Sequence, residues 1–276
     1  MRAVTPPAFV ARRLCCVIGT VAFFAASIVA ADDLHQIVET KSRYLLGASS
    51  GQKWIKAERA AKEFKAGTSF RLYSLTSEVG TADGGEVHPE EDVCPETQVV
   101  STLKTPESAV IGLAAPWNAL PRPVRVGDTT QAVYRAAVRS FITEHGLKNP
   151  EVKIAQILRV DLDGDGEDEV LISATNYSSE DGSAPTSGRK GDYSFVLLRR
   201  MRAGKVETKL VAGEFYRSAK TSDTPYVHRV AAILDLNGDG KMEIVVTSNY
   251  YEGGTTTVYR CTPTKVEEVL SVACGV

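Results

Sequence analysis

The chain has few histidines and cysteines, and it has no excess of positive charge. Its 276 residues include five cysteines and carry a net charge of −2, so nothing in it is basic enough to indicate nucleic-acid binding. It contains no Gly-x-Ser-x-Gly elbow, phosphate loop or Cys–His pairing, and no catalytic residue is predicted. The composition, 43% apolar and 24% charged, instead predicts a packed globular body. No spacing typical of a zinc site occurs among the four histidines, His35, His88, His145 and His228.

Only one apolar run approaches the length of a membrane span. It extends from Leu14 to Ala30, follows the pair Arg12-Arg13, and ends where polarity returns at Asp32. A basic start, an apolar centre and small residues before the break predict a secretory signal peptide over residues 1–31. An uncleaved anchor is the alternative, because a run of 17 residues touches the lower length limit for a span. After cleavage we expect a soluble protein that is secreted, periplasmic or extracellular.

Three cysteines remain after removal of the signal peptide, so two can pair in an oxidising compartment and one is left over. If residues 262–265 turn a hairpin, Cys261 faces about Val266. Cys274 then lies eight residues further along the strand, over ~20 Å away and beyond disulfide reach. A C-terminal tail that curls back would keep the Cys261–Cys274 bond as an alternative. We favour a Cys94–Cys274 bond, with Cys261 as a buried free thiol.

Residues 32–120 give short and mixed signals, and we expect a mixed α/β region there. Ala57–Phe64 shows helical spacing and strong helix formers. Residues 79–96 are polar, which predicts a loop. Trp54 and Trp117 are expected to lie in the core, with a groove position as the alternative. Three further segments are predicted strands: Ser69–Leu75, Val99–Leu103 and Ala109–Ala114.

A Pro-rich linker, residues 115–123, precedes the clearest helical pattern of the chain. Asp128 is positioned to cap this helix, with Gln131 as the reciprocal partner. Gly146 is predicted to end the helix, and Leu147 to pack back against it. A single apolar stripe runs along the helix, formed by Tyr134, Ala137, Val138, Phe141 and Ile142.

Residues 151–276 are rich in strands that fall into two groups of four. In each group an acidic loop joins the first strand to the second, and the second loop follows the first at an offset of 74 residues. Two four-stranded antiparallel repeat units are therefore expected. The first group comprises Ile154–Val160, Glu169–Asn176, Tyr193–Arg199 and Lys205–Val211, and the second comprises Val227–Leu234, Glu243–Asn249, Thr255–Arg260 and Val266–Val272.

The two acidic loops, Asp161–Glu169 and Asp235–Glu243, place oxygen-bearing side chains at every second position. Positions one, three, five and nine offer side-chain oxygens and position seven its backbone carbonyl. With water, these groups reach the six to eight oxygens that Ca²⁺ takes. The alternative is a pair of Asp-Gly-rich turns that hold no ion. The predicted ligands are Asp161, Asp163, Asp165, the carbonyl of Glu167, Glu169, Asp235, Asn237, Asp239, the carbonyl of Lys241, and Glu243.

These loops differ from an EF-hand, whose loop closes with Glu at position twelve, where this chain has Ile172 and Val246. The β-branched residues after each loop predict strands instead of helices. An apolar strand, the pattern Asp-x-Asp-Gly-Asp-Gly-x-x-Glu and a second apolar strand resemble the calcium loop of FG-GAP and VCBS repeats, the blades of integrin-α-type β-propellers. The resemblance covers residues 154–273 and implies two structural Ca²⁺ ions, with ligands bound elsewhere on the blades.

The expected fold is mainly β with one or two helices, and its two repeat units would belong to an incomplete or divergent propeller. The expected function is that of an exported calcium-binding repeat protein, a binding or structural module whose partner is a protein or a polysaccharide. The alternative is a calcium-dependent cell-surface hydrolase or lyase with its site in the N-terminal region, which a cleft of titratable residues away from the loops would favour. The expected organisation is a signal peptide (1–31), a mixed α/β region (32–120), a linker and helix (121–150) and two repeats (151–276).

Overall fold

The computed structural model describes Met1 and residues 33–177, 184–218 and 224–276. The predicted signal peptide lies outside this part of the chain, except for Met1, and stays a prediction. Asp33–Val276 forms one unit, and the strand pairs described within it are all antiparallel. Neither helix in the described residues is long and apolar enough to cross a membrane.

The segment before the Pro-rich linker forms the first sheet, with strand order β3-β2-β1-β8-β4-β5. The predicted helix over Ala57–Phe64 is present as α1 (Ala57–Lys62). Strands β6 and β7 pair with each other beside this sheet. The strands are β1 (His35–Glu39), β2 (Leu45–Ser50), β3 (Lys53–Lys56), β4 (Ser69–Tyr73), β5 (Glu78–Asp83), β6 (Val87–Pro89), β7 (Gln98–Val100) and β8 (Ile111–Leu113).

The prediction of a loop over residues 79–96 is wrong, because β5 and β6 lie largely within it. Strand β5 is the edge of the sheet and most of its side chains are exposed. Backbone pairing with β4 therefore holds it, and no apolar alternation marks it in the sequence. Trp54 and Trp117 are half-buried and pack against the margin of the core.

The second sheet has the order β13-β12-β11-β10-β9. Its four predicted strands are confirmed, and a fifth is added at the edge by the two-residue strand β9 (Arg125–Val126), which pairs with β10. Two residues are too few to show an alternating pattern, so β9 carries no sequence signal. The remaining strands are β10 (Ile154–Val160), β11 (Glu169–Thr175), β12 (Tyr193–Arg202) and β13 (Lys205–Phe215).

The third sheet has the order β14-β15-β16-β17 and matches the second predicted group. Cys261 pairs with Val266 in its last hairpin, as predicted from the turn. The favoured disulfide is confirmed: Cys94 and Cys274 are bonded, with their Cα atoms 5.6 Å apart. Cys261 is free, but it is only half-buried. The strands are β14 (Val227–Leu234), β15 (Glu243–Tyr250), β16 (Gly253–Cys261) and β17 (Val266–Gly275).

Helix α2 (Ala132–Glu144) buries three members of the predicted stripe, Tyr134, Val138 and Ile142. Its C-terminus is as predicted: Gly146 has a positive φ of 90°, and the Leu147 N–H donates to the Ile142 carbonyl at 3.3 Å. The predicted cap is wrong. The Asp128 carboxylate instead accepts the N–H and hydroxyl of Thr130, so a turn intervenes and the helix begins four residues later.

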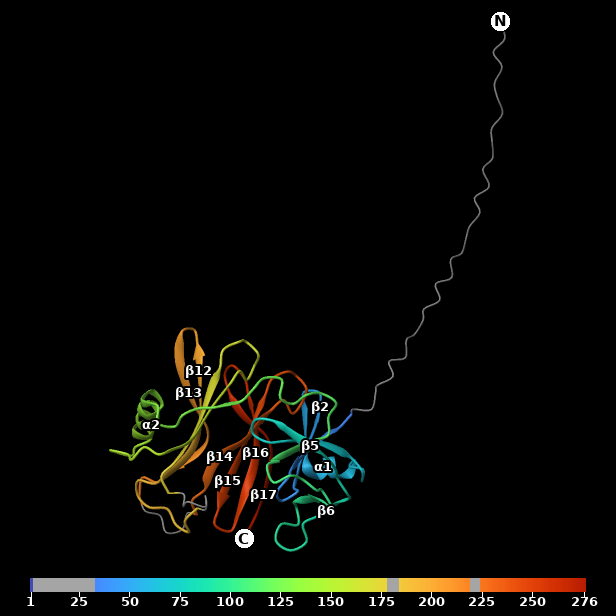
Figure 1. Cartoon of the computed structure of the whole chain (residues 1–276), viewed down its shortest axis with the longest axis horizontal. Helices are drawn as coiled ribbons and strands as arrows, with labels where there is room; N and C mark the ends of the chain where they lie inside the picture. Colours follow the sequence, from blue (N-terminus) through green and yellow to red (C-terminus); the bar gives the residue numbers. More distant parts are fainter. Residues whose placement is uncertain (2–32, 178–183, 219–223) are drawn as a thin grey trace. The chain divides into compact units, whose positions relative to one another are not determined.

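The third sheet is buried on both faces. One apolar cluster joins Leu234 and Val258 to Ile111 of the first sheet, and another joins Ile244 to Leu158 of the second sheet. Helix α2 covers the outer face of the second sheet. In Figure 1, the third sheet is the orange-to-red group of strands β14–β17. The protein is therefore mainly β, with two helices among the described residues and open, divergent propeller-like sheets.

Candidate functional site

The two acidic loops fold to the same hydrogen-bonded frame. The first aspartate of each loop accepts two backbone N–H groups. In the first loop, Asp161 Oδ1 accepts from Gly164 at 2.7 Å and Oδ2 from Gly166 at 3.1 Å. In the second, Asp235 accepts from the equivalent glycines at 2.7 and 3.0 Å. These glycines have positive φ values of 75° to 90°, which residues with a Cβ rarely adopt.

The other ligand positions repeat as well. Glu169 Oε2 accepts the Leu162 N–H at 2.8 Å, and Glu243 Oε2 accepts the Leu236 N–H at 2.9 Å, so the last carboxylate of each loop closes onto its start. Positions three and five each accept the N–H two residues ahead. These four acceptors are Asp163 (3.3 Å), Asp165 (2.8 Å), Asn237 (3.1 Å) and Asp239 (2.9 Å).

The frame brings three predicted ligands of the first loop together, and several ligand positions of both loops are exposed. Carboxylate oxygens of Asp161, Asp163 and Glu169 lie within 4.8 Å of one another. Asn237 replaces one carboxylate of this trio in the second loop. The position-seven residues whose carbonyls are predicted ligands, Glu167 and Lys241, are exposed, as are Asp163, Asp165 and Asp239.

The second loop is the drier of the two. Asp235 and Asn237 are each 4% exposed, and Glu243 is 1% exposed. Burial raises the pKa of Glu243 to about 8, and burial also raises the pKa values of Asp235 and Glu169. Carboxylates crowded in a dry site repel one another, and a cation would offset that cost. The residues present therefore fit a hard cation.

Arg122 of the Pro-rich linker binds both loops at once. Its Nη2 donates to the Leu162 carbonyl at 2.9 Å in the first loop and to the Gly240 carbonyl at 2.8 Å in the second. Its Nε donates to the Asp161 carbonyl. The loops also touch directly, because the Met242 N–H donates to the Leu162 carbonyl at 2.8 Å.

Trp117 of the same linker is seated on the second loop. Its Nε1 donates to the Asp235 carbonyl at 2.8 Å, and a Cβ at Gly238 would lie 3.1 Å from the indole ring. The Asp235 N–H in turn donates to the Ala119 carbonyl at 2.8 Å. Sequence reasoning missed these linker contacts, because no periodic spacing relates Trp117 or Arg122 to the loops.

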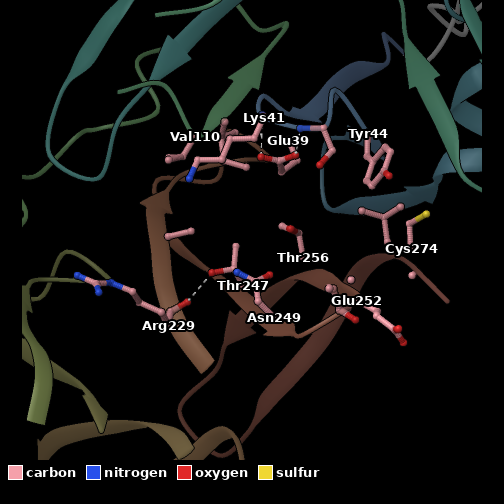
Figure 2. A pocket seen from close by; sticks show the side chains of 18 of the residues that line it. Glu39, Lys41, Tyr44, Val110, Arg229, Thr247, Asn249, Glu252, Thr256 and Cys274 are labelled. Carbon is pink, nitrogen blue, oxygen red and sulfur yellow. Dashed lines mark hydrogen bonds between the residues drawn. The ribbon is translucent and has the colours of Figure 1, made fainter. Parts of the chain in front are cut away.

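A cleft of about 690 Å³ lies between the first and third sheets (Figure 2). The end of β1 and the turn after it form one wall, with Glu39, Lys41 and Tyr44. The third sheet forms the other wall, with Thr247 and Thr256 among its lining residues. The acidic loops are not part of its lining. This cleft gathers titratable side chains away from the candidate metal sites.

Comparison with known proteins identifies one segment of the chain. Residues 227–259 match the family model described as FG-GAP repeat. No curated protein and no solved structure matches the chain. The matched segment contains β14, the second acidic loop, β15 and most of β16, and such a repeat indicates a binding or structural module. The chain therefore carries an FG-GAP repeat, as the resemblance of its loops implies, and the drier of its two acidic loops lies within that repeat.

Proposed function

We propose that this protein is an exported binding module whose two acidic loops each hold a structural Ca²⁺ ion. The observation that carries the proposal is the repeated frame, in which five equivalent hydrogen bonds orient the same side-chain positions in both loops. The ion would neutralise buried carboxylates and cross-link each loop. The residues that would hold it are Asp161, Asp163, Asp165, Glu169 and the carbonyl of Glu167 in one loop, and Asp235, Asn237, Asp239, Glu243 and the carbonyl of Lys241 in the other.

The first prediction concerns thermal stability. At a calcium concentration of about 100 times Kd, each site stabilises the folded state by about 2.7 kcal/mol. For a domain of this size that corresponds to roughly 5–10 °C in Tm. We expect calcium to raise Tm relative to EDTA, as measured by differential scanning calorimetry. Asp161→Ala and Asp235→Ala should each remove part of the gain.

Glu167→Gln is the matched control. The side chain of Glu167 is exposed, and only its backbone carbonyl is a proposed ligand, so this variant should keep the full calcium shift. Glu169→Gln, two residues away, should lose part of it. A Tm that calcium leaves unchanged, or equal losses in these two variants, would contradict the calcium sites.

Export is supported by the Cys94–Cys274 bond, since disulfides persist in oxidising compartments. The basic and apolar start of the chain supplies the signal peptide in this proposal. Without residues 1–31, 29 basic and 34 acidic residues remain, a balance that disfavours anionic partners such as nucleic acid. The cleaved signal peptide would be excluded if N-terminal sequencing of exported protein still began at Met1, and export itself would be excluded if the protein stayed entirely inside the cell.

The partner of the module is, in this proposal, a protein or a polysaccharide. A second candidate function, a calcium-dependent hydrolase or lyase, is favoured by the titratable groups in the cleft, which include Glu39 and Glu90 of the N-terminal region. However, backbone N–H groups of Cys94 and Val93 lower the pKa of Glu90, which suits an anion better than a general acid. New reducing ends released from a polysaccharide by the wild type, and not by Glu90→Gln, would favour the enzyme.

A further inference from the structure

The cleft between the first and third sheets has the dimensions of a small-ligand site. Its volume of about 690 Å³ lies in the range of roughly 300–1,000 Å³ that such sites occupy. Its walls come from segments far apart in the chain, near Glu39 on one side and Thr256 on the other (Figure 2). Both residues are polar and more than nine-tenths buried, at 8% and 9% exposure.

Glu39 offers two acceptor positions that no described residue uses. Its Oε1 accepts the Lys41 N–H at 2.8 Å, and its Oε2 accepts the Ser42 N–H at 2.7 Å. A carboxylate has about four acceptor positions, so roughly one remains on each oxygen. Among the described residues no cation forms an ion pair with Glu39. A buried carboxylate in this state favours a ligand that donates two adjacent hydrogen bonds.

The opposite wall presents neutral polar groups. Thr247 and Asn249 lie two residues apart on β15 and therefore point to the same face of the sheet. Thr256 is the cross-strand partner of Thr247 on β16. Gly254, the partner of Asn249, leaves room beside the amide, since a Cβ there would lie 2.4 Å from Asn249 Oδ1. The Thr247 hydroxyl already donates to the Arg229 carbonyl at 3.4 Å and therefore offers its oxygen as an acceptor, whereas the Asn249 amide and the Thr256 hydroxyl can both donate and accept.

The charges around the cleft do not select an ion of one sign. Lys41 and Arg229 line it together with three acidic residues, Glu39, Glu90 and Glu252, so charges of both signs face the cleft, and Figure 2 shows both basic side chains on the side away from Glu252. Apolar groups complete the lining, among them the ring of Tyr44 and the side chains of Val110 and Val272. Such a surface suits a ligand with both hydroxyl groups and C–H faces.

We propose that this cleft binds a neutral oligosaccharide, with two adjacent sugar hydroxyls donating to Glu39 and the C–H face of a ring against Tyr44. Sugar hydroxyls both donate and accept, so they match Thr247, Asn249 and Thr256 as well. The inference rests on the proposed function as a binding module and names its ligand class. The sugar would bind where the third sheet, which carries the FG-GAP repeat, meets the first sheet.

The test is isothermal titration of the mature chain in calcium buffer with cellotriose, maltotriose and chitotriose. We expect saturable binding of at least one trisaccharide, weakened tenfold or more by Thr256→Val and by Glu39→Gln. Thr257→Val is the matched control. Thr257 is the next residue on β16, bonds to Ser271 at 3.1 Å and does not line the cleft, so affinity should stay within twofold.

Glu39→Gln also changes the acceptor of the Lys41 and Ser42 N–H groups in the turn after β1. A variant that still folds correctly should keep the calcium-dependent Tm shift, so that shift serves as the folding check. Absence of saturable binding of all three sugars up to about 10 mM overturns the inference. Equal affinity in the wild type and Thr256→Val overturns it as well, as does binding of trialanine in place of the sugars. If the calcium shift persists without sugar binding, the inference fails while the calcium-binding module stands. If sugar binds but calcium does not shift Tm, the sugar-binding inference stands and the proposed metal sites are excluded.

Discussion

Asn237 occupies the position in the second loop that Asp163 occupies in the first. Asp163 is exposed, whereas Asn237 is almost fully buried beside the buried carboxylates of Asp235 and Glu243. A third buried negative charge would add a large desolvation cost, and an amide oxygen still serves as a ligand for a hard cation. The difference in residue type therefore follows the difference in burial.

A second residue-scale feature is His228, whose Nδ1 lies 2.7 Å from Ser248 Oγ and whose ring stacks near Tyr226. Burial lowers its pKa from 6.5 to about 4. The folded state thus favours neutral histidine, so its stabilising effect is complete above pH 6.5 and is lost as pH falls from 6.5 toward 4. The loss is about 2 kcal/mol near pH 4.5.

We therefore expect that the free energy of unfolding of His228→Gln falls less steeply than that of the wild type as pH decreases below 6.5. Urea unfolding at about pH 7 and about pH 4.5 measures it, with both proteins in the same calcium concentration so that loop carboxylates contribute equally. Wild type should lose about 2 kcal/mol more than the variant over this interval. Equal losses would show that His228 is not the group responsible.

At the scale of elements, the Pro-rich linker does more than separate two regions. Trp117 and Arg122 hold carbonyl oxygens of the acidic loops, and Arg71 of β4 donates through Nη1 to the Trp117 carbonyl. Arg122 Nη2 bridges the Leu162 carbonyl of the first loop and the Gly240 carbonyl of the second. When one loop becomes ordered, it therefore positions the hydrogen-bond donor of the other loop. This arrangement predicts that the two proposed calcium sites are coupled.

Trp117 lies against Gly238 of the second loop. In a Trp54→Phe background, its fluorescence should therefore report calcium binding at the second loop. Asp161→Ala in the first loop should weaken calcium binding at the second by about fivefold, a coupling of about 1 kcal/mol. In an Arg122→Gln background the same change should have less than a twofold effect. Arg125→Gln is the control, because Arg125 contacts Asp168 of the first loop alone. Unchanged coupling in Arg122→Gln would contradict the bridge.

For the whole molecule, the disulfide ties the loop before β7 to the last strand across 180 residues of sequence. It lies at one edge of the cleft, where Thr97 Oγ1 also donates to the Ala273 carbonyl at 2.9 Å. These contacts join the connection between β6 and β7 to the last strand of the third sheet. A bond that closes so long a segment restricts the unfolded chain strongly.

Replacing both Cys94 and Cys274 by serine should therefore lower the free energy of unfolding by about 2–5 kcal/mol. Cys261→Ser, which removes the free thiol, is the matched control and should cost far less. Chemical denaturation without reductant compares the three proteins. Equal stability of the double variant and the wild type would show that sheet packing alone holds the two regions together.

Prediction from sequence succeeded where local spacing determines structure. The eight strands of the two repeat units and the end of α2 at Gly146 all follow from residue patterns within a few positions. It failed for β5, an exposed edge strand held by backbone pairing, and for the Asp128 cap, where a competing turn forms. In both cases two local structures of similar energy compete, and the spacing of residues along the chain does not show which of them forms.

The sequence by itself determined the two acidic loops, because their acceptors and donors lie within nine residues of one another and need no distant partner. Only the tertiary structure decided what surrounds them and where a ligand would bind. Arg122 meets Gly240 across 118 residues of sequence, and Glu39 shares the cleft with Thr256 of another sheet. Such contacts arise from burial of apolar faces between sheets, and that packing brings polar groups together that no local pattern relates.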